Sequence, residues 1–329
     1  MMAYGEAVEN LSREMVLVSH IQRGAVQDGP GWRTTVYLKG CPLRCPWCYN
    51  AESLHFQQEL RYVPQFCIGA AACGRCLEVC RSGGIVPPGP DTDGRPVVRR
   101  QLCRVCGECT QVCPSGALSL VGRAMTAADI VQEAEKDRDF YCTSGGGLTL
   151  SGGEPLVRPT LAAAVMTLAH QKGLHTAIET CGWFDLDAPE NRTALRHCDL
   201  LIFDLKHLDS RQHRAFTHMD NSRILENLDR IVREFPALPL WVRTPVVRGF
   251  NDNEADIRDM ARHVAQLPTV TRHELLPCLP VGEEKYAQLG MVRSQLVNVG
   301  PDSAQLQELR AVVAACRREA RHGRAEGEA

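Results

Sequence analysis

Residues 33–50 read RTTVYLKGCPLRCPWCYN, a short strand-like run followed at once by three cysteines. The first six residues are rich in β-branched and aromatic types, which predicts a strand. The loop after it holds Cys41, Cys45 and Cys48 at C-x3-C-x2-C spacing. Three thiolates are one fewer than a closed zinc site or a fully ligated four-iron cluster uses. The stretch therefore predicts a metal centre with one outside ligand. That ligand is either a distant side chain on zinc, or a substrate or cofactor on the open iron of a [4Fe-4S] cluster.

The length and charge of the chain limit the fold classes and the kinds of binding partner to expect. It has 329 residues and a formal net charge of -2, which suits one large α/β domain or a barrel with an insertion. A near-neutral chain lacks the overall positive charge that is typical of nucleic-acid-binding proteins. No apolar run reaches the length of a membrane span, and the N-terminus lacks the features of a signal peptide. We therefore expect a cytoplasmic protein that binds neither nucleic acid nor membrane.

Cysteine usage points to metal or redox chemistry. Eleven of the sixteen cysteines fall between Cys41 and Cys113, and disulfides are rare in a reducing compartment. The other five lie singly in apolar surroundings, so we expect buried small hydrophobic residues at Cys142, Cys181, Cys198, Cys278 and Cys316.

The order of strands and helices predicts an α/β fold, a partial (β/α)6 barrel. A strand precedes the turn QDGPGW, the strand before the triad follows, and alternating helices and strands resume after residue 122. The run TAADIVQEAEKDRDFY predicts one amphipathic helix with Thr126 as its N-cap. Such alternation implies a parallel sheet with right-handed crossovers, and about six βα units suit an open barrel. The expected parts are an N-terminal tail (1–14), the barrel (15–60 and 123–317), an insertion (61–122) and a C-terminal tail (318–329).

The motifs that carry chemistry all follow predicted barrel strands. SGGEP follows GLTL, ETCGW follows HTAI, and DLK ends LLIFDLK. Active sites of βα barrels are built from the loops at these strand ends. Gly152 and Gly153 let the backbone approach a ligand closely, and Glu154 offers an acceptor for an ammonium group.

The insertion contains two further cysteine runs. The second run matches the bacterial ferredoxin pattern C-x2-C-x2-C-x3-C-P, whose fourth cysteine ligates the other cluster of a two-cluster module. By that rule one cluster takes Cys67, Cys73, Cys76 and Cys113. The other takes Cys80, Cys103, Cys106 and Cys109. Five residues separate Cys67 from Cys73 where two are usual, which weakens the case for Cys67. A double zinc ribbon is the competing interpretation.

CPLRCPWC, with an aromatic residue before its third cysteine, resembles the motif of the radical S-adenosylmethionine (SAM) superfamily. Together with QDGPGW, SGGEP, ETCGW, VRTPVVRGFND and ELLPCLPVGEEKYAQLG, it makes the chain from about Met15 to Arg293 similar to the glycyl-radical-enzyme activating enzymes. The resemblance is to the subgroup with an inserted ferredoxin-like domain that holds two [4Fe-4S] clusters. It implies a radical SAM oxidoreductase with three [4Fe-4S] clusters, and with SAM at the open iron.

The resemblance also implies roles for single residues. Cys41, Cys45 and Cys48 would hold the SAM-cleaving cluster, and Asp28 would touch the glycine loop of a partner. SAM itself would be contacted by Trp47, Cys48 and Tyr49 at the adenine, Gly152, Gly153 and Glu154 at the amino group, and Asp204, Leu205, Lys206 and Arg243 at the ribose and carboxylate. Glu179, Thr180 and Asp204 fall where pyruvate formate-lyase activases place a monovalent cation, with Glu179 replacing an aspartate. Leu279 replaces a histidine that contacts SAM in that branch.

The implied activity is reductive cleavage of SAM, followed by removal of a glycine α-hydrogen from a partner glycyl radical enzyme. An electron donor such as flavodoxin or ferredoxin would feed the clusters, and we expect a monomer. Two other functions remain open. A radical SAM enzyme that modifies another peptide or a small molecule would share the barrel, whereas a ferredoxin-type electron carrier would leave SGGEP and DLK without a role.

Overall fold

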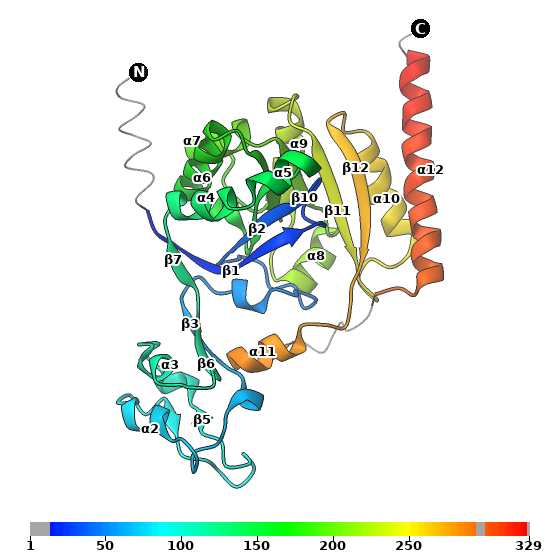
Figure 1. Ribbon diagram of the computed structural model, residues 1–329. Coiled ribbons are helices and arrows are strands. Elements are labelled where there is room, and N and C mark those ends of the chain that lie inside the picture. The colour runs from blue at the N-terminus through cyan, green and yellow to red at the C-terminus, as the bar shows by residue number, and fades with distance from the viewer. Residues whose placement is uncertain (1–13, 294–299, 328–329) are drawn as a thin grey trace.

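The computed structural model describes residues 14–293 and 300–327 (Figure 1). Its centre is a sheet of eight strands in the order β12-β11-β10-β9-β8-β2-β1-β7. The strands are β1 (Val16–Ala25), β2 (Arg33–Leu38), β7 (Arg123–Met125), β8 (Gly147–Gly152), β9 (His175–Thr180), β10 (Leu200–Asp204), β11 (Leu240–Val246) and β12 (Val270–Pro277). From β2 to β12 all neighbours pair in parallel, whereas β1 pairs antiparallel with both β2 and β7. The predicted α/β fold, with six parallel strands in an open sheet, is confirmed.

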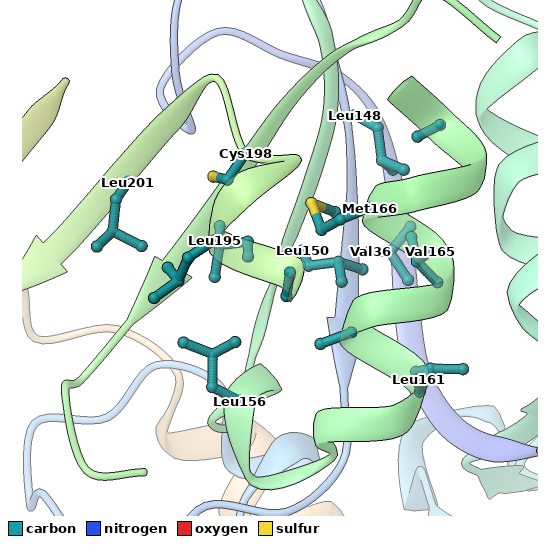
Figure 2. Close-up of a cluster of buried hydrophobic side chains, with 14 of the residues drawn as sticks. Val36, Leu148, Leu150, Leu156, Leu161, Val165, Met166, Leu195, Cys198 and Leu201 are labelled. Carbon is teal, nitrogen blue, oxygen red and sulfur yellow. The ribbon is translucent and has the colours of Figure 1, made fainter. Parts of the chain in front are cut away.

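The two faces of the parallel strands differ in polarity. Val36, Leu148 and Leu150 point to the helix-covered face, where they are fully buried against α6 (Pro159–Gln171; Figure 2). The alternate residues of these strands, such as Thr35 and Thr149, are polar and also buried. Side chains along a strand alternate between faces, so the sequence directs one apolar face to the core and one polar face to the inside of the barrel.

Helices cover the apolar face and the end of the sheet. They are α4 (Ala127–Glu135), α5 (Arg138–Ser144), α6, α7 (Pro189–Arg196), α8 (Ser210–Thr217), α9 (Ser222–Glu234), α10 (Glu254–Ala265), α11 (Glu283–Leu289) and α12 (Ser303–Gly327). Short 3-10 turns are η1 (Ala51–Ser53), η2 (Pro64–Phe66), η3 (Arg100–Leu102) and η4 (Pro155–Val157).

One prediction about the helix after β7 needs correction, and one holds. The single helix expected over 126–141 is two helices, α4 and α5. The chain breaks at Asp137, because that carboxylate turns to accept hydrogen bonds from Arg23 Nε (2.8 Å) and Thr34 Oγ1 (2.6 Å). The N-cap of α4 is as predicted, since Thr126 and Asp129 form a reciprocal capping box.

The predicted tails are only partly within the described residues. The N-terminal tail, 1–14, lies outside them except for Glu14. The C-terminal tail, expected from residue 318, is wrong up to Gly327, because α12 continues to that residue. The stretch is rich in Arg, Ala and Glu, which favour helix.

The insertion lies apart from the sheet, at the lower end of the molecule in Figure 1. Its elements are β3 (Glu59–Tyr62), α2 (Arg75–Val79), β4 (Ile85–Val86), β5 (Val97–Val98), α3 (Glu108–Gln111) and β6 (Leu118–Val121). β3 and β6 pair antiparallel and form the stem of the insertion. The expected boundaries, 61 and 122, fall within and just after this stem.

None of the helices in residues 14–293 and 300–327 combines the length and hydrophobicity that a bilayer crossing requires.

Candidate functional site

The cysteine triad lies in the loop after β2, at the carboxyl end of the parallel strands. Backbone hydrogen bonds hold this loop against η1: Gly40 N–H donates to Ser53 O (2.8 Å) and Cys41 N–H donates to Leu54 O (3.2 Å). Within the loop, Cys48 N–H donates to Cys45 O (3.0 Å). The triad is therefore local to one loop whose backbone is fixed by the sheet.

The surroundings of the three thiols differ. Burial raises the pKa of Cys45 and Cys48, that of Cys48 to about 11. Metal binding therefore has to displace their protons. A hydrogen bond from the Cys181 thiol lowers the pKa of Cys41, although burial opposes it. Cys181, in ETCGW at the end of β9, was expected to be a plain buried hydrophobic residue, and its spacing gave no sign of this contact.

The other single cysteines can also be compared with expectation. Cys198, Cys278 and Cys316 are buried, as predicted. Cys142 is exposed, so the prediction is wrong there. Cys142 lies on α5, whose buried side chain is that of the preceding residue, Tyr141.

The glycines of SGGEP bring the loop after β8 against the triad loop. Gly152 has φ +106°, a left-handed conformation that favours glycine. A Cβ on Gly153 would lie 2.1 Å from the carbonyl oxygen of Gly40, which directly precedes the triad. Glu154 N–H donates to the same carbonyl (2.8 Å). We predicted close approach to a ligand, and the structure shows close approach to the triad loop.

Glu154 is buried, with 1% of its surface exposed. Its carboxylate accepts hydrogen bonds from Leu156 N–H (3.0 Å), Thr180 Oγ1 (2.8 Å) and Cys181 N–H (2.7 Å). Burial raises its pKa despite these donors. Glu154 therefore joins the loop after β8 to the end of β9, and an ammonium group would be a further donor to it.

Strands β9 to β12 bring charged side chains together on the inner face of the sheet. Lys206 Nζ lies 2.9 Å from Asp204 Oδ2, and Arg243 Nη1 lies 2.7 Å from Glu179 Oε1. Arg243 Nε also lies 3.1 Å from Glu274 Oε2. Burial opposes the charge of Lys206, but Asp204 and the nearby Cys45 outweigh it and raise its pKa. The oxygens expected to bind a monovalent cation thus already face an arginine and a lysine.

The turn between β1 and β2 reaches the same place from the other side. Asp28 Oδ2 accepts hydrogen bonds from Thr35 Oγ1 (2.8 Å) and Tyr37 Oη (3.1 Å), both on the inner face of β2. Arg243 Nη2 donates to the carbonyl of Gln27. The turn between β1 and β2 is therefore in direct contact, at Gln27, with Arg243, the predicted SAM contact on β11.

The segment 279–293, which includes α11, contributes residues to the site that were not among the predicted site residues. Tyr286 Oη donates to Cys48 O (3.0 Å), and Arg293 Nε donates to Pro46 O (3.0 Å). Lys285 Nζ lies 3.9 Å above the ring centre of Tyr49. These side chains reach the triad loop from about 240 residues away in sequence. The motif ELLPCLPVGEEKYAQLG contains Lys285 and Tyr286, whereas Arg293 lies three residues after it and has no signal in the sequence.

Three more residues predicted to contact SAM are Trp47, Tyr49 and Leu205, and Leu279 stands where a histidine contact was expected. The Trp47 ring packs 5.0 Å from that of Phe250. Tyr49 is 53% exposed and Leu279 is 58% exposed. Leu205 is buried, and its N–H donates to Arg243 O (2.8 Å).

The insertion contains two cavities, and the eight cysteines divide between them. One cavity is lined by Cys67, Cys73, Cys76 and Cys113. The other cavity is lined by Cys80, Cys103, Cys106 and Cys109. This division matches the crossing rule applied to the sequence, and it places Cys67 with its expected group.

The two cavities lie at different distances along the stem. At the barrel end, Lys39 Nζ pairs with Glu59 Oε2 at 2.8 Å. The next residue, Leu60, lines the Cys103 cavity, whereas Tyr62, two residues farther out, lines the Cys67 cavity. The cysteine set that includes Cys103 is therefore the nearer one to the barrel.

The donor sets match those of iron–sulfur clusters. A fully ligated [4Fe-4S] cluster is held by four cysteine thiolates. Four cysteines around each cavity, and three on one loop, fit two complete [4Fe-4S] sites and one with an open iron.

Comparisons with known proteins agree with this assignment. The model of the radical SAM superfamily matches residues 101–261, that of a 4Fe-4S single cluster domain matches 27–69, and that of a 4Fe-4S dicluster domain matches 66–117. These models account for SAM and three clusters.

Full-length relatives are also found. Isethionate sulfite-lyase activating enzyme from Oleidesulfovibrio alaskensis is 43% identical over 90% of this chain and 94% of its own. (2S)-3-sulfopropanediol sulfolyase activating enzyme from Bilophila wadsworthia is 42% identical over 89% and 94%. Benzylsuccinate synthase activating enzyme from Thauera aromatica is 40% identical over 84% and 83%.

Proposed function

The chain belongs to the radical SAM activating enzymes of glycyl radical enzymes, and from this premise we propose how its residues carry out that activity. Cys41, Cys45 and Cys48 would hold the triad cluster. When bound and reduced, that cluster would supply the electron that cleaves SAM to methionine and a 5'-deoxyadenosyl radical, which would take the α-hydrogen of a glycine of the partner enzyme and leave 5'-deoxyadenosine. The remaining residues bind and orient SAM, keep water out and receive the partner.

The contact between Arg243 and the DGPG turn carries the proposal. Arg243 is 5% exposed and bonds the carbonyl of Gln27, next to Asp28. Residues expected to hold SAM and the turn expected to meet the partner therefore share one hydrogen bond. A protein substrate whose glycine has to reach the SAM site would approach it across this turn.

We assign the charged groups by their surroundings. Arg243 and Lys206 are buried cations whose pKa values are raised by neighbouring carboxylates, so both stay charged. They can orient the carboxylate of SAM, while Glu179 and Asp204 keep the two cations in position. Because each cation already has an acidic partner, binding of the SAM carboxylate exchanges or shares these bonds.

The insertion supplies the route for electrons. Clusters held by its two cysteine sets would relay electrons from a protein donor such as flavodoxin or ferredoxin. The Cys103 set, nearer the barrel, would be the inner one. Arg100 Nη2 donates to Gln288 O (2.7 Å) on α11, and α11 contacts the triad loop through Tyr286. This contact holds the insertion in a fixed position relative to the triad. We also propose that the protein is a cytoplasmic monomer.

The test is formation of a glycyl radical on a partner. Isethionate sulfite-lyase is the first partner to try, because it is named in the relative that shares 43% identity, and benzylsuccinate synthase is the comparison. Mixed anaerobically with SAM and a reductant, the correct partner should develop a carbon-centred doublet in electron paramagnetic resonance (EPR). If deoxyadenosine forms but no glycyl radical enzyme gains the doublet, modification of another peptide or a small molecule becomes the better explanation.

A further inference from the structure

Three apolar side chains are exposed beside the DGPG turn. Val26 is 68% exposed, Trp32 is 40% exposed and Phe140, on α5, is 53% exposed. The Trp32 and Phe140 rings stack with centroids 5.3 Å apart and an interplanar angle of 20°. Trp is enriched among the energetically important residues of protein interfaces, and aromatic side chains offer a large area for a partner to bury.

The position of Trp32 is fixed by the fold. The backbone N–H of Trp32 donates to Ser144 Oγ (2.9 Å), and its backbone carbonyl accepts from Gly147 N–H (3.1 Å). A Cβ on Gly24 would lie 2.6 Å from the indole, so glycine is needed there to let the ring lie flat on β1. The aromatic pair is thus held in place before any partner arrives, which lowers the entropy cost of binding.

The patch adjoins the turn that reaches the SAM site. Val26 and Trp32 flank residues 27–31, in which Gln27 bonds Arg243 and Asp28 bonds Tyr37. A protein substrate that delivers a glycine to this turn must cover the surface around it. A stable interface buries about 800 Å² on each partner. The nearest apolar surface to the turn would therefore lie inside that interface.

We propose that Val26, Trp32 and Phe140 form the docking surface for the glycyl radical enzyme, which would cover them with apolar side chains next to its glycine loop. The proposal rests on the proposed function and adds where the partner binds. Because the patch does not touch the predicted SAM contacts, it should determine partner affinity and leave SAM cleavage unaffected.

The experiment compares Trp32→Ala, Phe140→Ala and Phe140→Lys with Phe66→Ala. Phe66 is a matched control, since it is 59% exposed but lies in the insertion. Glycyl radical formation is followed by EPR against partner concentration, with a chemical reductant. Iron content and thermal unfolding check that each variant is folded. Phe140 is more exposed than Trp32, so its variants test the surface even if Trp32→Ala folds poorly.

The expected result is a change in partner affinity alone. The Trp32 and Phe140 variants should need about tenfold or more partner for half-saturation, as loss of a central interface aromatic typically causes. The maximal rate at saturating partner, the KM for SAM and SAM cleavage without partner should match the unaltered protein. Phe66→Ala should change none of these values.

Two results would overturn the proposal, and they can be told apart. If the Trp32 and Phe140 variants saturate at the same partner concentration as the unaltered protein, the docking surface is wrong and the proposed function stands. If the unaltered protein gives no glycyl doublet with any glycyl radical enzyme, the proposed function fails and the docking surface fails with it.

Discussion

Thr149 offers a way to move the DGPG turn without touching SAM or the triad. It lies on the inner face of β8 and is fully buried. Its Oγ1 accepts a hydrogen bond from Arg33 Nε (2.6 Å) and donates one to Asp28 O (2.8 Å). Arg33 is itself fully buried and also donates to Pro30 O (3.3 Å). Thr149 and Arg33 therefore support the turn from beneath.

Replacing Thr149 with Val keeps the side-chain shape and removes both hydrogen bonds. The bond to the Arg33 guanidinium is a bond to a charged group, worth about 1.5–3 kcal/mol, and the bond to Asp28 O is worth about 0.5–1.5 kcal/mol. Loss of both should destabilise the protein by about 2–4.5 kcal/mol and lower the apparent melting temperature by several degrees. The turn also loses its hydrogen bond to β8, so Asp28 should be held less firmly and the affinity for the partner should fall.

Thr34→Val is the matched control. Thr34 is equally buried, on β2, but its Oγ1 faces the helices, where it donates to Asp137 (2.6 Å) and accepts from Tyr141 (2.6 Å). Thermal unfolding should show a similar loss of stability in both variants. In the EPR assay only Thr149→Val should raise the partner concentration for half-saturation, with the KM for SAM unchanged. If both variants behave alike toward the partner, the support of the turn plays no part in recognition.

Three further predictions concern the clusters and the SAM site. Gly153→Ala should weaken SAM binding by about tenfold, because its Cβ would collide with Gly40 O at a cost of about 1–3 kcal/mol. Equilibrium dialysis tests this, and Gly89→Ala, where the nearest atom is 3.9 Å away, should bind normally; equal binding by both variants would refute it. Cys45→Ala should abolish SAM cleavage with any electron donor, whereas Cys106→Ala should retain cleavage with a strong chemical reductant and lose it with a protein donor. Complete loss in both, with the triad cluster of the Cys106 variant intact by EPR, would contradict a relay. Metal analysis after anaerobic reconstitution should give about twelve irons per chain, and about four irons with zinc would contradict the cluster assignment.

Local sequence was sufficient for the fold class and for the grouping of cysteines. The alternation of strands and helices predicts parallel pairing because crossovers have one favoured hand. The two cysteine runs predict which residues line each cavity because the fourth ligand crosses between clusters. Both rules depend on spacing along the chain, which the sequence states directly.

Local sequence was less reliable for helix boundaries and side-chain partners that depend on tertiary contacts. Residues 126–141 have one continuous helical pattern, and the break at Asp137 comes from its bonds to Arg23 and Thr34 on β1 and β2. Likewise, the motif SGGEP predicts Glu154 as an acceptor for an ammonium group, but it does not reveal that the carboxylate also accepts hydrogen bonds from Thr180 and Cys181 in the folded chain. A motif identifies which loop is functional but not which groups its side chains will meet.

Tertiary structure alone decided the contacts between distant loops. Cys181 N–H donates to Glu154, Arg243 bonds the carbonyl of Gln27, and Tyr286 bonds the carbonyl of Cys48. None of these pairs shares a periodicity or a spacing, because each joins loops that become neighbours only when the sheet closes toward a barrel. The sequence by itself determined the strands, the cysteine sets and the motifs at the strand ends. Which of those ends touch depends on the twist and stagger of the assembled sheet, a property of all its strands together.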